Sequence, residues 1–404
     1  MKASEIEVLC YKFLAMALSV IIVLLLCSCA LLDIAAPSTE GAAARGDGQT
    51  ACFREIYYLD TYIDITLYSW NDNDGETALD EAEAVFQRVD GLFDRFDEAS
   101  EIYRINNAAR EEREEGSVKV SSETFYLLKT ALEYCAQSGG AFDIGMGAVS
   151  DLWDFKADIA AIIGATATSN DVPSGSATAT SNGVPTGSAT ATNGVPTGSP
   201  PDPGELAKAL AVGGYKKIIL HEEDLSVETP QGMSIDLGGI AKGYAVREAA
   251  AALERAGVIS AVIDAGGNVH VIGGKRSQND IRPMNVGIRH PRPKQKDELL
   301  AIVSVKDKSV VTSGDYNRYF MSGDTRYHHI LDPSTGAPAH ESISATIIAD
   351  DSALADYLST AVFVLGAIKG LELIATYPGV EAIIVAPDMS VFTSPGFDGE
   401  ILSQ

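Results

Sequence analysis

Basic residues are scarce in this 404-residue chain. It has 30 Lys and Arg against 56 Asp and Glu, which gives a formal net charge of −26 at pH 7. A surface with that balance repels the nucleic-acid backbone and anionic membranes, so we expect no nucleic-acid partner. It also means that any polyanionic ligand needs a bound metal ion or clustered Lys and Arg side chains.

Cysteine is scarce as well. The chain has 5 cysteines, and only Cys52 and Cys135 lie outside the N-terminal segment. Two such residues do not make a disulfide framework. Cys135 shares a helical face with Phe125 and Leu128, which predicts burial. Histidines are few and, apart from one adjacent pair, are scattered without metal-ligand spacing.

The N-terminal apolar run is too short to span a membrane comfortably. It covers Phe13–Leu26, follows two lysines and has the length of a signal-peptide hydrophobic region. Leu26 stands three residues before Cys29, and the small residue Ser28 directly precedes that cysteine. We therefore predict a lipoprotein signal peptide over residues 1–28 and lipidation of Cys29. An ordinary secretory signal and a signal anchor are the alternatives.

Composition divides the rest of the chain. Residues 29–52, rich in Ala, Gly and Thr, predict a flexible tether, and residues 53–404 predict a folded domain. Within it, residues 164–201 contain three copies of an Ala/Thr/Ser/Gly/Pro unit that cannot bury a core, which predicts a disordered insertion. Helical and strand patterns interleave elsewhere, and neighbouring strands often join by short turns. We expect an α+β fold with a mixed β-sheet and packed helices.

Several predicted elements bear on the site. The patterns predict strands at 57–68, 233–237, 261–272 with a Gly-Gly kink, and 344–349, a helix at 240–257, a helix at 352–365 capped by Asp350 or Asp351 and closed by Gly366, and a final short hairpin.

The chain is organised around the stretch 234–246, SIDLGGIAKGYAV. Gly238 and Gly239 separate the β-like run from the helix, and such a turn aims backbone N–H groups and a helix N-terminus at an anion. Asp236 enters the turn and Lys242 leaves it, which suits a nucleotide or sugar phosphate. The spacing fits neither a P-loop nor a dinucleotide fingerprint. The alternative is a tight connection with one exposed lysine.

Two further groups of residues have chemical potential. Asp356 and Thr360 lie four apart on one helix face, and with a backbone carbonyl from a glycine turn they would make an oxygen-only site suited to Mg²⁺. The alternative is a surface Asp beside a Thr bonded to its own helix. His328 and His329 precede a turn, where a histidine can act as a general base. A strand histidine with both nitrogens satisfied is the alternative.

These segments together resemble the ApbE family of FAD:protein FMN transferases. The resemblance runs through FDRFDEASEIYRIN, GGAFDIGMGAVSDLWDF, DLGGIAKGYAV, TSGDYNRYF, HHILDPSTGAP and ADYLSTA, in that order. It covers essentially everything from Tyr57 to the C-terminus apart from the insertion. It departs from the family at Leu59-Asp60-Thr61, where Met-Gly-Thr is usual, and at Gly145-Met146, where Thr-Val is commoner.

The resemblance implies an activity and a set of residues. FAD would be split at its pyrophosphate, FMN attached through phosphate to a Thr or Ser of an acceptor protein, and AMP released. The acceptor would belong to a membrane redox complex or be an extracytoplasmic flavoprotein, and the enzyme would be anchored by lipid on the extracytoplasmic side. The resemblance assigns Mg²⁺, with Mn²⁺ as an alternative, to Asp356, Thr360 and the Gly239 carbonyl, with Ser359 close by. It assigns the role of general base to His329. The residues that it assigns to FAD binding are Asp236, Lys242, Ala141, Phe142, Asp143, Phe96, Ile330 and Leu59.

Two rival functions remain open on the sequence. An FAD-binding or FAD-hydrolysing lipoprotein would release FMN and AMP to water without transfer to protein. A binding lipoprotein without catalysis would deliver a small nucleotide, although it would have no need to keep Asp356, Thr360 and His329 together.

Overall fold

The structure is a computed structural model. It describes residues 43–45, 49–68, 72–110, 117–153, 155, 198–277 and 280–402. The predicted signal peptide with Cys29, most of the tether and nearly all of the repeat insertion therefore lie outside the described residues. The first two strands lie partly inside the segment predicted as a tether, since they begin at Ala43 and Gln49.

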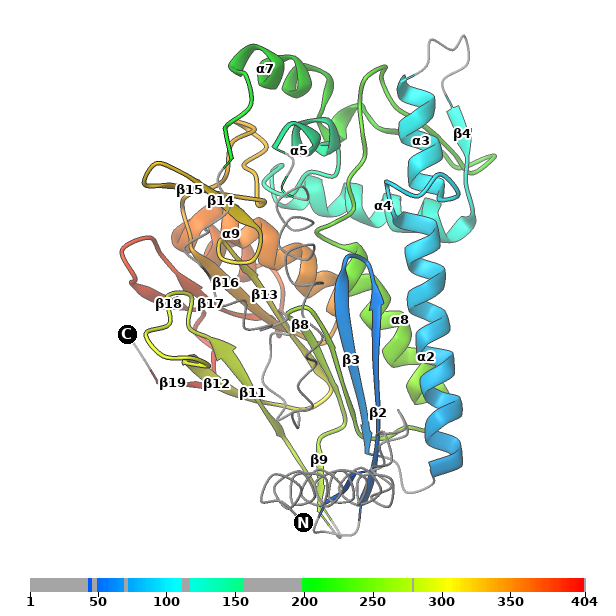
Figure 1. The fold of residues 1–404 in the computed structure, drawn as a ribbon, viewed down its shortest axis with the longest axis vertical. Helices are drawn as coiled ribbons and strands as arrows, with labels where there is room; N and C mark the ends of the chain where they lie inside the picture. The colour runs from blue at the N-terminus through cyan, green and yellow to red at the C-terminus, as the bar shows by residue number, and fades with distance from the viewer. Residues whose placement is uncertain are drawn as a thin grey trace, which may run out of the picture. The chain divides into compact units, whose positions relative to one another are not determined.

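A nine-stranded sheet forms the middle layer of the domain (Figure 1). Every pairing among the described strands is antiparallel, so the α+β class is confirmed and the sheet is antiparallel where we expected a mixed one. In spatial order the strands are β1 (Ala43–Arg45), β2 (Gln49–Tyr58), β3 (Thr61–Tyr68), β7 (Ala261–Ala265), β8 (Asn268–Ile272), β13 (Lys308–Gly314), β16 (Ser344–Ala349), β17 (Glu381–Val385) and β18 (Val391–Thr393).

Helices cover one face of this sheet. The apolar side chains of α2 (Asp72–Phe93), α4 (Ser122–Gln137), α8 (Ala241–Arg255) and α9 (Ser352–Ile374) join those of the sheet in one large core cluster. Cys135 is part of that cluster, as predicted, and burial raises the pKa of its thiol. Burial of this continuous apolar surface is the main stabilising contribution to the domain.

A smaller sheet covers the opposite face. It consists of β11 (Met284–Arg289), β12 (Leu299–Val305) and β19 (Gly399–Ile401). Its apolar residues form a second cluster with side chains of the large sheet, including Val269 and Val310. Because β19 pairs with β12 while β18 pairs with β17, the final hairpin expected from the sequence is wrong.

The remaining elements lie around these layers. They are α3 (Glu101–Arg110), β4 (Ser117–Lys119), α5 (Gly147–Trp153), α7 (Pro203–Val212), the 3-10 turn η1 (Tyr215–Lys217), β5 (Ile219–His221), β6 (Ser226–Glu228), β9 (Lys275–Ser277), β10 (Asp280–Arg282), β14 (Tyr319–Ser322) and β15 (Thr325–His328).

Helix α9 is the one described helix that is long and apolar enough to cross a membrane by length and composition. However, 67% of its most apolar window is buried inside the domain, so it is a core helix. Asp351 caps it by accepting from the Leu354 N–H at 2.9 Å, as one of the two predicted caps. The first helical stretch ends at Gly366, as predicted, since its φ and ψ are not helical, and a second helical stretch follows this kink within α9.

The strand predicted over 57–68 is in fact a hairpin. β2 ends at Tyr58, and Leu59 and Asp60 form a two-residue turn with φ values of 54° and 57°. Two positive φ values match the twist of a hairpin and usually call for Asn or Gly. Leu59 and Asp60 are neither Asn nor Gly, so the sequence gives no sign of a turn there. The alternation of apolar and polar residues therefore predicted one continuous strand.

The kink at Gly366 provides a test of the fold. Its φ of 75° and ψ of 179° are essentially restricted to glycine, and an added Cβ would lie 2.8 Å from the Glu341 Cβ. We expect Gly366→Ala to lower the free energy of unfolding by roughly 1–3 kcal/mol in urea denaturation. The matched control is Gly91→Ala in α2, where an added Cβ would meet nothing within 4 Å. It should be neutral or about 1 kcal/mol more stable, and equal losses in both variants would contradict the assignment.

Candidate active site

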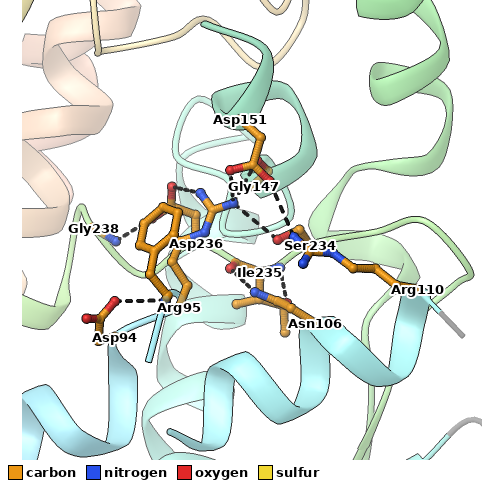
Figure 2. Close-up of polar contacts among 11 residues, drawn as sticks. Asp94, Arg95, Asn106, Arg110, Gly147, Asp151, Ser234, Ile235, Asp236 and Gly238 are labelled. Atoms are coloured by element: carbon orange, nitrogen blue, oxygen red, sulfur yellow. Dashed lines mark hydrogen bonds and ion pairs between the residues drawn. The ribbon is translucent and has the colours of Figure 1, made fainter. Parts of the chain in front are cut away.

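The side chain of Arg95 fixes the entry to the central glycine turn (Figure 2). Its Nη1 donates to Asp236 Oδ2 at 2.9 Å. Its Nη2 donates to Asp151 Oδ1 at 2.6 Å and to the Gly147 carbonyl at 3.0 Å, and lies 3.3 Å from Ser234 Oγ. The guanidinium therefore ties the end of α2 to α5 and to the segment that leads into the turn.

The segment 233–237 is extended but pairs with no strand, so the predicted short strand is wrong. Its backbone bonds are made elsewhere: Asn106 Nδ2 donates to the Ile235 carbonyl at 2.9 Å, and the Ile235 N–H donates to Asn106 Oδ1 at 2.7 Å. The Asp236 N–H donates to the Ile144 carbonyl at 2.8 Å. Figure 2 shows the buried Asn106 reaching this segment from α3.

Asp236 is held as an anion. Burial of the carboxyl raises its pKa, but the Arg95 guanidinium and the Gly238 N–H, 2.9 Å from Oδ1, outweigh that effect and leave the pKa below its ordinary value. The charge of the carboxylate is already compensated inside the protein. Any contact with a ligand would thus use an acid that is fixed in place.

The first turn of α8 packs closely against α9. The Gly243 N–H donates to Asp356 Oδ2 at 2.8 Å. A Cβ at Gly243 would lie 2.4 Å from the Ser352 carbonyl oxygen and 2.6 Å from the Asp356 Cβ, so only glycine permits this approach. A Cβ at Gly239 would lie 3.3 Å from Thr360 Oγ1. The structure thus puts Asp356 against the first turn of α8 and Thr360 against Gly239.

This donor set fits a hard divalent cation. Asp356 is buried, and burial raises its pKa, while Lys242 and the Gly243 N–H lower it. A buried carboxylate beside a hydroxyl and a backbone carbonyl is the kind of oxygen site that Mg²⁺ accepts. The described residues contain no group of three His, Cys, Asp or Glu side chains placed to hold a metal.

Ser359 has a different role from its neighbours. Its hydroxyl donates to the Asp356 carbonyl at 2.8 Å and also lies 2.8 Å from Ser313 Oγ, and the residue is fully buried. The hydroxyl proton is therefore used within the helix. We place Ser359 beside the donor set, as a support for the turn of α9 that carries Asp356 and Thr360.

The two adjacent histidines differ in their hydrogen bonds. His328 Nε2 lies 2.8 Å from the Ala339 carbonyl, and His328 Nδ1 accepts from the Ile330 N–H at 3.3 Å. Both of its nitrogens are thus satisfied inside the protein. His329 Nδ1 lies 3.3 Å from the Arg318 carbonyl. Because a carbonyl only accepts, Nδ1 carries the proton and Nε2 is left as an acceptor.

His329 is neutral at physiological pH. Burial lowers the pKa of its imidazole to about 3, with further lowering by Arg318, His328 and Lys242. A neutral ring with an available Nε2 can take a proton from a hydroxyl. The prediction that His329 is the better base of the pair is consistent with this geometry.

The residues predicted to contact FAD lie on several loops. Phe96 is 51% exposed, and the Arg95 guanidinium lies 5.0 Å from its ring centroid. Phe142 is buried against Tyr357, with ring centroids 5.3 Å apart. Asp143 accepts from two backbone N–H groups and so braces its loop; Ala141 and Ile330 are half-buried and buried, respectively.

The hairpin turn at Leu59 reaches the histidine segment through Arg318. The Leu59 N–H donates to Asp90 Oδ1 at 2.8 Å, and Arg318 Nη2 donates to the Asp60 carbonyl at 3.0 Å. The Arg318 carbonyl in turn accepts from the His329 N–H at 3.0 Å. Sequence analysis missed both Arg95 and Arg318, because an arginine within a matching segment does not reveal which distant groups it will contact.

The fold and the site define an α+β domain with a glycine turn packed against Asp356 and Thr360 and with a neutral histidine, His329. Residues 59–384 match the ApbE family, and the chain belongs to that family. It is 35% identical over 294 residues to the FAD:protein FMN transferase of Treponema pallidum, covering 69% of this chain and 70% of that protein. It is 35% identical over 198 residues to a FAD:protein FMN transferase of Klebsiella pneumoniae, covering 48% and 60%.

Solved structures of ApbE proteins are similar to this chain. The ApbE protein of Thermotoga maritima superposes with a TM-score of 0.67 at 30% identity, over 85% of this chain and 97% of that chain. The flavin transferase ApbE of Vibrio cholerae gives a TM-score of 0.66 over 86% and 98% at 21% identity, a likeness of fold.

Removal of the Arg95 side chain tests its role in the site. In Arg95→Met, Asp236 loses its counter-charge and Asp151 keeps only the Arg110 guanidinium, 3.8 Å away. We expect the free energy of unfolding at pH 7 to fall by roughly 2–3 kcal/mol, below the range for fully buried pairs because both carboxylates are partly exposed. Arg104→Met, which removes a surface pair with Glu101, should cost at most about 0.5 kcal/mol.

The pH dependence of that loss has a definite sign. A folded-state pKa below the unfolded value stabilises the protein above about pH 4, the ordinary Asp pKa, and that contribution disappears as pH falls through the folded-state pKa. The difference between wild type and Arg95→Met in urea unfolding should therefore shrink below pH 4. A constant difference between pH 7 and pH 3 would show that the Asp236 charge is not what Arg95 stabilises.

Proposed function

We propose that this chain is an enzyme that transfers the FMN part of FAD to a Thr or Ser hydroxyl of an acceptor protein, with Mg²⁺ and with release of AMP. The observation that carries the proposal is that Asp356 contacts the first turn of α8 and Thr360 lies against Gly239, in a member of the ApbE family that also has a neutral His329. The relatives named above carry the same activity in their names.

A Mg²⁺ ion would be held by Asp356, Thr360 Oγ1 and the Gly239 carbonyl. When bound, it would supply charge neutralisation for the pyrophosphate, which a chain with a net charge of −26 otherwise lacks. Mn²⁺ takes the same oxygen donors and is the alternative.

His329 would activate the acceptor. Its Nε2 takes the proton from the Thr or Ser hydroxyl while the hydroxyl oxygen forms a bond to the phosphorus of the FMN half. The bond between that phosphorus and the bridging oxygen breaks, and AMP leaves with the electron pair. The tautomer needed for this step is the one that the Arg318 carbonyl selects.

The remaining residues would position FAD. Lys242, whose Nζ donates to the Gly238 carbonyl at 3.0 Å, stands at the start of α8 beside the donor set. Asp236, fixed by Arg95, would accept from hydroxyl or ring N–H groups. Leu59, Phe96, Ile330 and the loop at Ala141, Phe142 and Asp143 would line the rest of the dinucleotide site.

The assay for transfer uses the full-length chain in detergent with FAD, Mg²⁺ and a test protein that bears a Ser-Gly-Ala-Thr segment. We expect an acceptor that is fluorescent and heavier by one FMN in intact mass spectra. Asp356→Ala should abolish the product, and His329→Gln should slow it by roughly 10²–10⁴-fold. His221→Gln, on β5 and paired with Glu228, is the matched histidine control and should leave the rate unchanged.

The other outcomes separate the rival functions. Release of free FMN and AMP with an unlabelled acceptor would favour FAD hydrolysis over transfer. Bound FAD that stays intact in the presence of Mg²⁺ would favour a binding protein. Full activity in Asp356→Ala would contradict the metal assignment.

We also propose that Cys29 is lipidated and that the domain acts on the extracytoplasmic side, on an acceptor from a membrane redox complex or an extracytoplasmic flavoprotein. The support is the signal-like run that ends at that cysteine. In a bacterial host, Cys29→Ser should move the chain from the membrane fraction to the soluble fraction, while the matched Cys27→Ser should leave it membrane-bound. Unchanged membrane association of Cys29→Ser would rule out the anchor.

A further inference from the structure

We propose that Arg318 is an anion-binding residue of this site, whose guanidinium holds the phosphate of the AMP half of FAD while the bond to FMN is broken. This inference rests on the proposed function and adds to it a residue for the leaving group.

The first argument is the way arginine charge is used in this acidic chain. Most arginines of the described residues are paired with carboxylates; the exceptions include Arg255, which is exposed, and Arg289, whose guanidinium carbon lies 5.8 Å from the Tyr316 ring centroid. Arg318 has no ion pair among the described residues, and its guanidinium makes one hydrogen bond, to the neutral Asp60 carbonyl at 3.0 Å. The arginines that do pair are Arg54, Arg88, Arg95, Arg104, Arg110, Arg247, Arg292 and Arg326.

A guanidinium has five N–H donors, so one bond to a carbonyl leaves most of them unused. Arg318 is half-buried, where an unused charged donor is costly unless a ligand or water meets it. With 56 acidic residues in the chain, a carboxylate partner would be easy to supply. A site that must receive a phosphate is a physical reason for its absence, because a resident carboxylate would compete with the ligand.

The second argument is the position of Arg318 relative to the base. Its backbone carbonyl accepts from the His329 N–H at 3.0 Å and lies 3.3 Å from His329 Nδ1. The backbone of Arg318 therefore orients the His329 imidazole, and the side chain of the same residue carries a positive charge. The Arg318 charge also acts on the ring, since it contributes to lowering the pKa of His329.

The third argument concerns the distribution of positive charge. The Lys242 Nζ donates to the Gly238 carbonyl at 3.0 Å and therefore lies at the glycine turn, on the side of the donor set. Arg318 lies on the side of the β2–β3 hairpin turn. A pyrophosphate has two phosphates, and the two cations would each serve one of them.

The chemistry of the leaving group favours a guanidinium. When the bridging P–O bond breaks, its electron pair stays on the AMP phosphate, whose negative charge rises. Arginine meets a phosphate with two parallel N–H donors and does not lose its charge at any working pH. A cation that gains interaction energy as the bond breaks accelerates the step.

A structural role is the alternative, in which Arg318 only fastens the hairpin turn through the Asp60 carbonyl. Such a role predicts that all flavin ligands bind less tightly when the side chain is removed, whether or not they carry phosphate. The anion-binding role predicts a loss that is restricted to ligands with the AMP phosphate. Riboflavin, FMN, AMP and FAD together separate these cases.

The experiment measures dissociation constants of these four ligands by calorimetry, using the full-length chain in detergent with Mg²⁺. The variants are Arg318→Gln and the conservative Arg318→Lys. The matched control is Arg326→Gln, which removes a neighbouring arginine on β15 that pairs with Asp315. We expect Arg318→Gln to weaken AMP and FAD by roughly ten- to hundred-fold, with riboflavin and FMN unchanged. Arg318→Lys should recover part of the loss, and Arg326→Gln should change none of the four.

Unchanged binding of AMP and FAD by Arg318→Gln would overturn the inference. So would an equal loss for riboflavin, which would assign Arg318 to the turn, or a loss for FMN without one for AMP, which would assign it to the other phosphate. A wild-type chain that binds no FAD would instead refute the proposed function itself, and the two failures are therefore distinguishable.

Discussion

The close approach of α8 to α9 is the constraint on which the site depends. At Gly243 a side chain would collide with the Ser352 carbonyl and with Asp356, and the Gly243 N–H instead donates to the Asp356 carboxylate. Beside that contact, Gly239 lies close to Thr360 Oγ1, and the Lys242 Nζ donates to the Gly238 carbonyl. Because both helices are anchored in the main core cluster, the donor set is held by packing as well as by its own hydrogen bonds.

Because Lys and Arg are few in this acidic domain, the position of each one near the site strongly affects the charges there. Arg95 has a structural role. It keeps Asp236 ionised and connects the end of α2 to α5 and to the entry of the glycine turn. Burial lowers the pKa of His329, the proposed base, and Arg318 and Lys242 lower it further. The same positive charge that suits a pyrophosphate thus also prepares the base, so binding and proton transfer depend on one local field.

Much of the fold could be predicted from local patterns. The cap at Asp351 and the strand over 344–349 are where the sequence indicated them. The predictions failed where contacts between residues far apart in the sequence determine the local structure. Asn106 satisfies the backbone of Ile235 from 129 positions away, which removes the need for a strand there. The helical spacing of Asp356 and Thr360 and the resemblance supplied the candidate ligands, but the bonds of Ser359, the tautomer of His329 and the role of Arg95 required the structure.

A crystal of the protein grown with FAD and Mn²⁺, measured at the manganese absorption edge, would test the central claim most directly. The account predicts one strong anomalous peak among the Gly239 carbonyl, the Asp356 carboxylate and Thr360 Oγ1, with the pyrophosphate beside it and His329 Nε2 facing the phosphorus of the FMN half. A peak at another place, or a pyrophosphate on the far side of α8, would contradict it.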